Sequence, residues 1–221
     1  DIGYLKELAL MPSFSGFSQS DKIKGKYNDY ETEITNITLL TDGSTGKGAV
    51  KYPDWVVPIL FLISKFVKDF SIKKVFSGLF IKAVSNKKYD GKVIVLPEKS
   101  KNTEKGLQKV ELEDPEFEKY FDVYATDQVE ARYMLTTGFM NRLVTIVSDP
   151  DFYTSKTSFD SILLSFEYGN VNLALSCKKR LFDFPLTKTA DNIDVYKNTV
   201  KELSSILKII AELKLDQKIG M

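Results

Sequence analysis

Two carboxylates near the middle of the chain, Asp127 and Glu130, have the residue types and spacing that could do chemistry. Residues three apart share a helix face, so the pair could act as general acid and base or bind a hard cation. The same spacing forms a capping box, in which both side chains bond to backbone N–H groups at a helix start. Catalysis predicts that the carboxylates face a pocket, whereas capping predicts bonds to backbone N–H groups. We expect capping, and keep a hydrolase or metal-dependent enzyme that uses Asp127 and Glu130 as an alternative.

Several kinds of active site are excluded by the residue types that the chain lacks. The sequence has no histidine, which is the commonest general base near neutral pH and the commonest metal ligand. This excludes the histidine-dependent serine triad, the cysteine and histidine pair, and most zinc sites. The one cysteine, Cys177, can form no intramolecular disulfide, and its strand pattern predicts a buried, small apolar side chain. We expect no metal site and no cofactor.

A glycine-rich stretch from Gly43 to Gly48 resembles part of a phosphate-binding loop. Such a loop needs four residues between its glycines and then a serine or threonine after the lysine. Here only two residues separate Gly43 from Gly46, and Gly48 follows Lys47. The stretch therefore predicts a solvated loop and not a nucleotide site.

The overall charge gives no reason to expect a nucleic acid as partner. Lysine and arginine total 31 against 30 aspartate and glutamate residues, a formal net charge of +1. The aromatic residues also lack the basic neighbours that a groove for single-stranded nucleic acid needs. We expect the partner to be another protein or a membrane surface.

The elements that must position these residues are hairpins and separate helices. Strand patterns predict three hairpins: 23–27 with 30–40, 75–84 with 92–97, and 159–168 with 171–178. Stretch 13–21 predicts a loop. Periodicity and capping predict helices at 2–11, near Asp114, Asp127 and Thr136, and a long C-terminal helix at about 192–213. This order indicates an α+β fold, a mostly antiparallel sheet with helices packed on one face. We expect residues 1–221 to form a single α+β domain.

Within that domain, residues 41–74 predict a loop followed by an amphipathic helical insertion, Trp55 to Phe70. The helix can begin at Pro58, and its apolar stripe follows the spacing of one helix face. Such a stripe can cover the sheet, or it can lie in a lipid interface. We expect packing on the domain, with Trp55 near the surface, and keep lipid-interface binding as an alternative. The stripe consists of Ile59, Leu62, Ile63, Phe66, Val67 and Phe70.

Residues 114–142 resemble an uncharacterised bacterial family known as domain of unknown function 3137. Weaker similarity extends over most of the chain, for example at 76–80, 91–97 and 181–182, whereas residues of roughly 50–74 depart from the family's usual pattern. In that family two transmembrane helices usually precede this region, so the resemblance implies an upstream membrane anchor, and the start at Asp1 agrees with a fragment. The most recognisable block contains Tyr124, Asp127, Gln128, Glu130, Arg132 and Tyr133.

These observations lead to a functional hypothesis without an assigned activity. The chain has no run of about 20 apolar residues and no signal-peptide pattern. With no histidine and no cofactor motif, we expect a non-enzymatic interaction or sensor domain tethered at the cytoplasmic face of a bacterial membrane. The alternatives are the enzyme that uses Asp127 and Glu130, and lipid binding through Trp55, Ile59, Leu62, Phe66 and Phe70.

Overall fold

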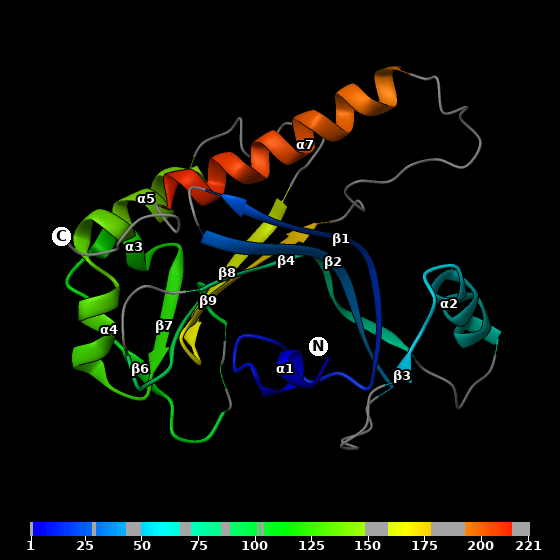
Figure 1. Ribbon diagram of the computed structural model, residues 1–221. Coiled ribbons are helices and arrows are strands. Elements are labelled where there is room, and N and C mark those ends of the chain that lie inside the picture. The colour runs from blue at the N-terminus through cyan, green and yellow to red at the C-terminus, as the bar shows by residue number, and fades with distance from the viewer. Residues whose placement is uncertain are drawn as a thin grey trace.

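The architecture is α+β, built on one large and mostly antiparallel sheet (Figure 1). The structure, a computed structural model, describes residues 2–27, 30–42, 50–66, 72–84, 89–100, 102, 104–148, 159–177 and 193–213. In these residues nine strands form the sheet, in the order β3-β1-β2-β4-β9-β8-β5-β7-β6. All neighbours pair antiparallel except β1 and β3. The strands are β1 (Gly16–Tyr27), β2 (Tyr30–Thr41), β3 (Val50–Lys51), β4 (Lys73–Val84), β5 (Val93–Pro97), β6 (Gln108–Val110), β7 (Phe121–Ala125), β8 (Phe159–Glu167) and β9 (Asn170–Cys177).

The first hairpin is longer than its local sequence predicts. The loop predicted at 13–21 is wrong from Gly16 onward, because this segment pairs with β2 from Gly16 opposite Leu40 to Ser20 opposite Asn36. Pairing with a β-branched partner strand supplies the backbone hydrogen bonds that the serine-rich composition does not signal locally. The turn predicted at Asn28 and Asp29 lies outside the described residues.

The second predicted hairpin, between 75–84 and 92–97, is wrong. β4 pairs with β2 and β9, whereas β5 pairs with β7 and β8. The hairpin of β8 and β9 occupies the space between β4 and β5, so these neighbours in sequence do not touch as strands. That central hairpin turns at Tyr168 and Gly169, one residue earlier than predicted. Both residues have positive φ angles, 53° and 69°, as a tight primed turn requires.

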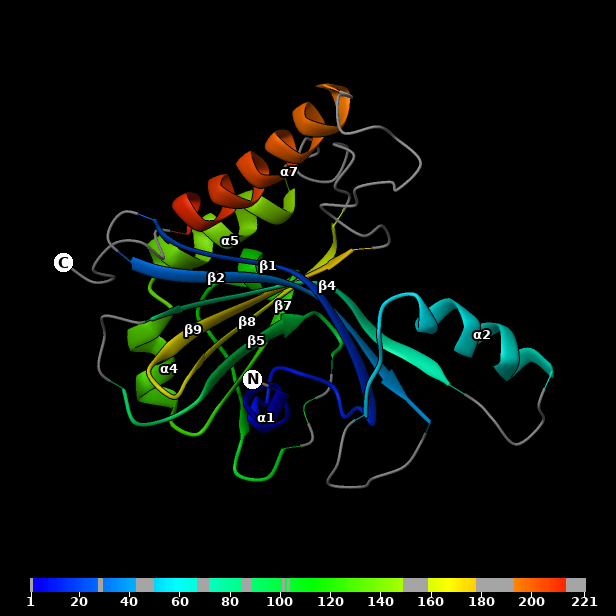
Figure 2. The ribbon, with the colours of Figure 1, turned by 45° about the vertical axis from the view of Figure 1, so that its right-hand side comes forward.

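One face of the sheet carries the larger core. It is covered by α3 (Pro115–Glu118), α4 (Gln128–Met134), α5 (Thr137–Ser148) and α7 (Ile193–Glu212), as Figures 1 and 2 show. The Asp114 carboxylate accepts a hydrogen bond from the Phe117 N–H at 3.1 Å and caps α3. Each large apolar side chain fully buried in such a core contributes about 1.5–3 kcal/mol. Fully buried members include Phe117, Met134, Phe139, Leu143, Ile146, Leu164, Phe166, Ile206 and Ile209.

The opposite face is also covered, so the prediction that helices pack on one face only is wrong. Helix α1 (Ile2–Glu7) and the segment after it pack there, with Leu5, Leu8 and Leu10 buried (Figures 1 and 2). Strands β2 and β4 present Leu39, Phe76 and Phe80 to this second cluster. Both faces of the central strands are thus buried, which explains their nearly continuous apolar runs.

Candidate functional site

The two candidate carboxylates lie at the start of α4, and both bond to backbone N–H groups. The Asp127 carboxylate accepts hydrogen bonds from Val129 N at 2.6 Å and Glu130 N at 3.1 Å, which caps the helix. Glu130 reaches away from its own helix and accepts hydrogen bonds from Asp90 N at 3.1 Å and Gly91 N at 2.9 Å. This arrangement differs from a capping box, because Glu130 holds the loop before β5 and not its own helix start.

Glu130 and Thr126 can approach the backbone of Gly91 closely because glycine has no side chain. A Cβ atom at this position would collide with the Glu130 carboxylate and with Thr126 Oγ1. Thr126 Oγ1 also accepts a hydrogen bond from Lys92 N at 2.9 Å. Thr126, which follows β7, and Glu130 of α4 therefore clamp the loop that leads into β5, while Asp127 caps α4.

Two other residues of the block that resembles the family, Tyr124 and Arg132, donate hydrogen bonds to backbone carbonyls. The Tyr124 hydroxyl donates to the Ser100 carbonyl at 2.9 Å. The Arg132 guanidinium donates to the Glu111 carbonyl at 3.2 Å and, more weakly, to the carbonyl and side-chain oxygens of Gln128 at 3.4 and 3.5 Å. Tyr133 exposes about half of its surface. Tyr124 and the bond from Arg132 to Glu111 thus join β7 and α4 to neighbouring loops, whereas the contacts between Arg132 and Gln128 stay within α4.

Helix α2 (Val56–Phe66) presents the largest described set of exposed apolar side chains. None of its residues is buried, and Trp55 and Phe66 are 71% and 79% exposed. At about 3.6 residues per turn the exposed side chains fall on one continuous face. This face, called the α2 face below, consists of Trp55, Pro58, Ile59, Leu62, Ile63 and Phe66.

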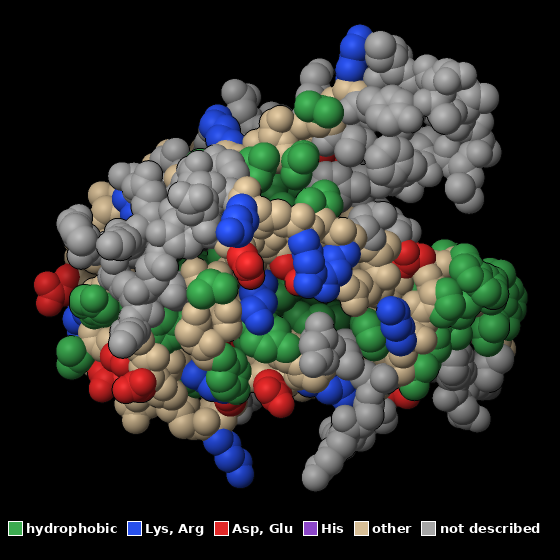
Figure 3. Space-filling model, in the orientation of Figure 1, with side chains coloured by type: hydrophobic (Ala, Val, Ile, Leu, Met, Phe, Trp, Pro, Cys, Tyr) green, Lys and Arg blue, Asp and Glu red, His purple; other side chains and the backbone are tan. Residues whose placement is uncertain are grey.

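The preference for packing this stripe on the domain is therefore wrong for its described members. Helix α2 stands at one end of the sheet, where Figure 2 shows it projecting beyond the strands. The sheet surface beside α2 presents polar side chains such as Ser18, Asn36 and Ser77, so the α2 face has no apolar sheet surface to meet there. Figure 3 shows the resulting hydrophobic patch at that end of the molecule. Val67 and Phe70 lie outside the described residues.

The start of α2 is fixed to the sheet. The Tyr52 N–H donates to the Phe17 carbonyl at 2.7 Å, and the Ser18 hydroxyl donates to the Asp54 carboxylate. Val57 is half-buried on the side of the helix opposite to its exposed face. These contacts hold the helix in one direction, so its apolar face points away from the sheet.

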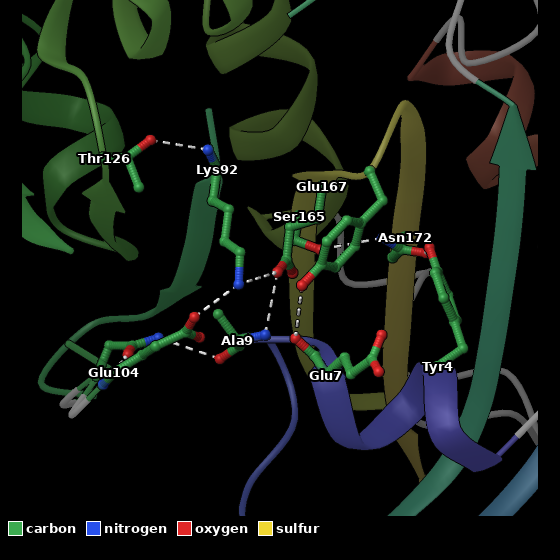
Figure 4. Close-up of polar contacts among 11 residues, drawn as sticks. Tyr4, Glu7, Ala9, Lys92, Glu104, Thr126, Ser165, Glu167 and Asn172 are labelled. Carbon is green, nitrogen blue, oxygen red and sulfur yellow. Dashed lines mark hydrogen bonds and ion pairs between the residues drawn. The ribbon is translucent and has the colours of Figure 1, made fainter. Parts of the chain in front are cut away.

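A buried polar cluster that the sequence did not predict lies beneath α1 (Figure 4). Its centre is Glu167, at the end of β8, whose side chain is fully buried. The carboxylate oxygen Oε2 accepts a hydrogen bond from Ala9 N at 3.1 Å and lies 3.6 Å from Lys92 Nζ, whereas Oε1 has no partner among the described residues. Burial raises the pKa of Glu167 above its usual range, against the opposing effects of Ser165, Ala9 and Lys92.

Tyr4 and Lys92 complete this cluster from its two sides. The Tyr4 hydroxyl donates to Asn172 Oδ1 at 2.7 Å, and burial raises the pKa of Tyr4 to about 12. Lys92 Nζ lies 2.6 Å from Glu104 Oε1. Burial alone would lower the pKa of Lys92, but the hydrogen bond and charge of Glu104 outweigh it and the pKa is raised. The available sequence signal was a glutamate that ends a strand rich in apolar residues.

Cys177 lies in the core, and burial raises the pKa of its thiol to about 12, so it carries no thiolate near neutral pH. Among the described residues, no group of three or more cysteine, aspartate and glutamate side chains is arranged to hold a metal ion. The glycine-rich stretch Gly43 to Gly48 lies outside the described residues. No helix in the described part of the chain has the length and apolar character needed to cross a bilayer.

Comparison with known proteins gives one family and one solved structure. The model of the family "Protein of unknown function (DUF3137)" matches residues 74–215, which include the clamp around Glu130 and the buried Glu167. No curated protein matches the chain in sequence. The crystal structure of the mycobacterial trehalose monomycolate transport factor A, TtfA, is similar at 11% identity and a TM-score of 0.37, over 88% of this chain and 73% of that chain.

Proposed function

The chain belongs to the DUF3137 family of proteins of unknown function, and we propose that it is a non-enzymatic interaction module that docks on a membrane surface through the α2 face. The exposed face of α2 carries this proposal. It is an apolar surface on a helix that is fixed at the sheet end and has no buried residue. Contiguous apolar patches of this kind on soluble domains mark interaction sites.

The chemistry of α2 favours a lipid interface as the surface it meets. An 11-residue helix is about 16 Å long, too short to span a bilayer but long enough to lie in the interface. Trp55 stands at one end of the face, and an indole ring prefers the boundary between headgroups and acyl chains. Phe66 and Lys65 stand at the other end, so an apolar anchor sits beside a cation that can reach the headgroups.

The free energy available from this face is enough for reversible docking. Full burial of a large apolar side chain gives about 1.5–3 kcal/mol. Burial of two or three such side chains from the α2 face would give a weak, reversible attachment, comparable to that of a single lipid anchor. An upstream anchor at the cytoplasmic face, which the family resemblance implies, would raise the local concentration of α2 at the bilayer and make this weak contact effective.

Trp55 allows a direct test, because it is the only tryptophan of the chain. We expect its fluorescence to shift to shorter wavelength when the protein is added to phospholipid vesicles, and to be quenched by lipids brominated near the headgroup. Phe66→Asp should weaken vesicle binding while leaving the melting temperature nearly unchanged, because Phe66 makes no core contact.

The matched control is Val129→Asp, which adds the same charge at an exposed apolar residue of α4, outside the α2 face. This variant should bind vesicles as the unmodified protein does. If Trp55 fluorescence is unchanged by vesicles of every composition, or if Phe66→Asp lowers the melting temperature as a core substitution would, the proposal is wrong. A concentration-dependent dimer that Phe66→Asp dissociates would replace the membrane by a second copy of the chain.

A further inference from the structure

We infer that the α2 face binds anionic bilayers in preference to neutral ones, through a rim of four lysines around it: Lys51, Lys65, Lys73 and Lys74. This inference rests on the proposed function and adds the headgroup class. All four lysines are exposed. In the part of the chain that the structure describes, none of the four forms an ion pair.

The sheet register brings three of these lysines to one end. Lys73 lies opposite Thr41, and Lys74 lies opposite Leu40. Leu40 in turn lies opposite Gly16, and Gly16 lies beside Val50, the residue before Lys51. Lysines from β3 and β4 therefore stand at the two sides of the strands that carry the start of α2.

In the sequence, the same lysines come both before and after the helix. Lys51 precedes Val56 by five residues, and Lys73 follows Phe66 by seven. Lys65 is part of α2 and borders the exposed stripe. Lysines therefore precede, belong to and follow the helix that carries the apolar face.

Two described carboxylates, those of Asp42 and Asp54, also lie at this end. No aspartate or glutamate occurs from Trp55 to Phe66. The Asp54 carboxylate accepts a hydrogen bond from Ser18, and the Asp42 carboxylate accepts one from Ser15 at 2.8 Å. Four lysines against these two carboxylates leave the described part of this end positively charged, in a chain with a net charge of only +1.

An apolar face bordered by lysines is suited to phospholipids that carry negative charge. The apolar side chains enter the acyl boundary, while the long lysine side chains keep their ammonium groups at the headgroups. Each lysine close to an anionic bilayer strengthens binding by about fivefold at low salt, and screening weakens this at high salt. A neutral partner surface would gain nothing from these four charges.

The test compares vesicles of phosphatidylcholine alone with vesicles that contain phosphatidylglycerol, using Trp55 fluorescence and co-sedimentation. The first variant carries Lys51→Gln, Lys73→Gln and Lys74→Gln. The control carries Lys99→Gln, Lys105→Gln and Lys119→Gln, which remove the same charge from exposed lysines outside the rim. Lys65 is kept, so that α2 itself is unchanged.

We expect the unmodified protein and the control to bind phosphatidylglycerol vesicles at least about tenfold more tightly than neutral ones, with the preference lost at high salt. The rim variant should lose most of this preference and keep only the roughly fivefold that Lys65 alone gives, and Trp55 should still shift at high lipid concentration. Equal binding of the unmodified protein to both vesicle types would overturn the inference and leave the proposed function standing. An equal loss in the control would also overturn it, because the effect would then come from total charge. Binding to neither vesicle type would remove the proposed function itself.

Discussion

The carboxylate of Glu167 lies 3.6 Å from the ammonium group of Lys92, and the glutamate side chain is fully buried while the lysine reaches solvent. Lys92 lies closer to a second carboxylate, that of Glu104, at 2.6 Å. Ala9 N–H is the other described donor to the Glu167 carboxylate, and it belongs to the segment that follows α1. The protonation of Glu167 should therefore be coupled to the packing of the N-terminal segment on the sheet.

The stability of the protein should fall as the pH rises through the pKa of Glu167. Burial raises this pKa in the folded protein above its usual value of about 4.5. The folded state then binds the proton more tightly than the unfolded state does. The stability that Glu167 contributes is fully present below pH 4.5 and is lost as the pH rises through the raised pKa.

Urea unfolding between pH 4 and 8 measures this effect when the unmodified protein is compared with Glu167→Gln. The glutamine is neutral at every pH, so the difference in unfolding free energy between the two proteins should change in favour of the variant as the pH rises. Parallel curves over the whole range would show that Glu167 titrates with the same pKa in both states.

Substitutions at Glu130 and Gly91 should have coupled effects on the unfolding free energy. Glu130→Ala removes two hydrogen bonds to backbone N–H groups and should cost about 1–3 kcal/mol of unfolding free energy. Gly91→Ala should also destabilise, because the new methyl group would collide with Glu130 and Thr126.

A double-mutant cycle tests whether the effects of these two substitutions are coupled or independent. With Glu130 replaced by alanine, part of the collision at residue 91 disappears, so the double variant should be less destabilised than the sum of the single variants. Strict additivity in denaturant titrations would contradict the contact between these two residues.

Cys177 should report global opening of the core. Its thiol is buried and its pKa is raised to about 12, so the folded protein should react slowly with a thiol reagent at pH 8. The urea-unfolded protein is the control and should react at once. Rapid labelling of the folded protein would mean that β9 opens locally without unfolding of the sheet.

The sequence predicted much of the fold where the signals are local. The central hairpin and the starts of the helices at Asp114 and Asp127 follow from turn and capping residues. The predicted pairing of 23–27 with 30–40 is confirmed, but the extension of β1 back to Gly16 and the partners of β5 could not be predicted in this way. Strand pairing there depends on segments that are distant in the sequence. The covering of the second face by α1 has the same origin.

The candidate site was predicted less well, for a physical reason that α2 makes clear. Periodicity shows that a helix has an apolar face, but it does not show whether another surface covers that face. The residues of α2 have the pattern of a core helix, but their apolar face is exposed because the neighbouring sheet surface is mostly polar. Glu167 was missed because a single charge in a strand does not reveal its burial.

Both outer strands of the sheet are very short, with two residues in β3 and three in β6. β3 pairs only with Gly16 and Phe17, and the rest of β1 carries an irregularity between Ser20 and Lys22 followed by Lys24 and Lys26. Short edges, bulges and lysines oppose the addition of further strands. If α2 concentrates the protein on a surface, as proposed, these features keep its nine-stranded sheet from becoming a template for fibre growth.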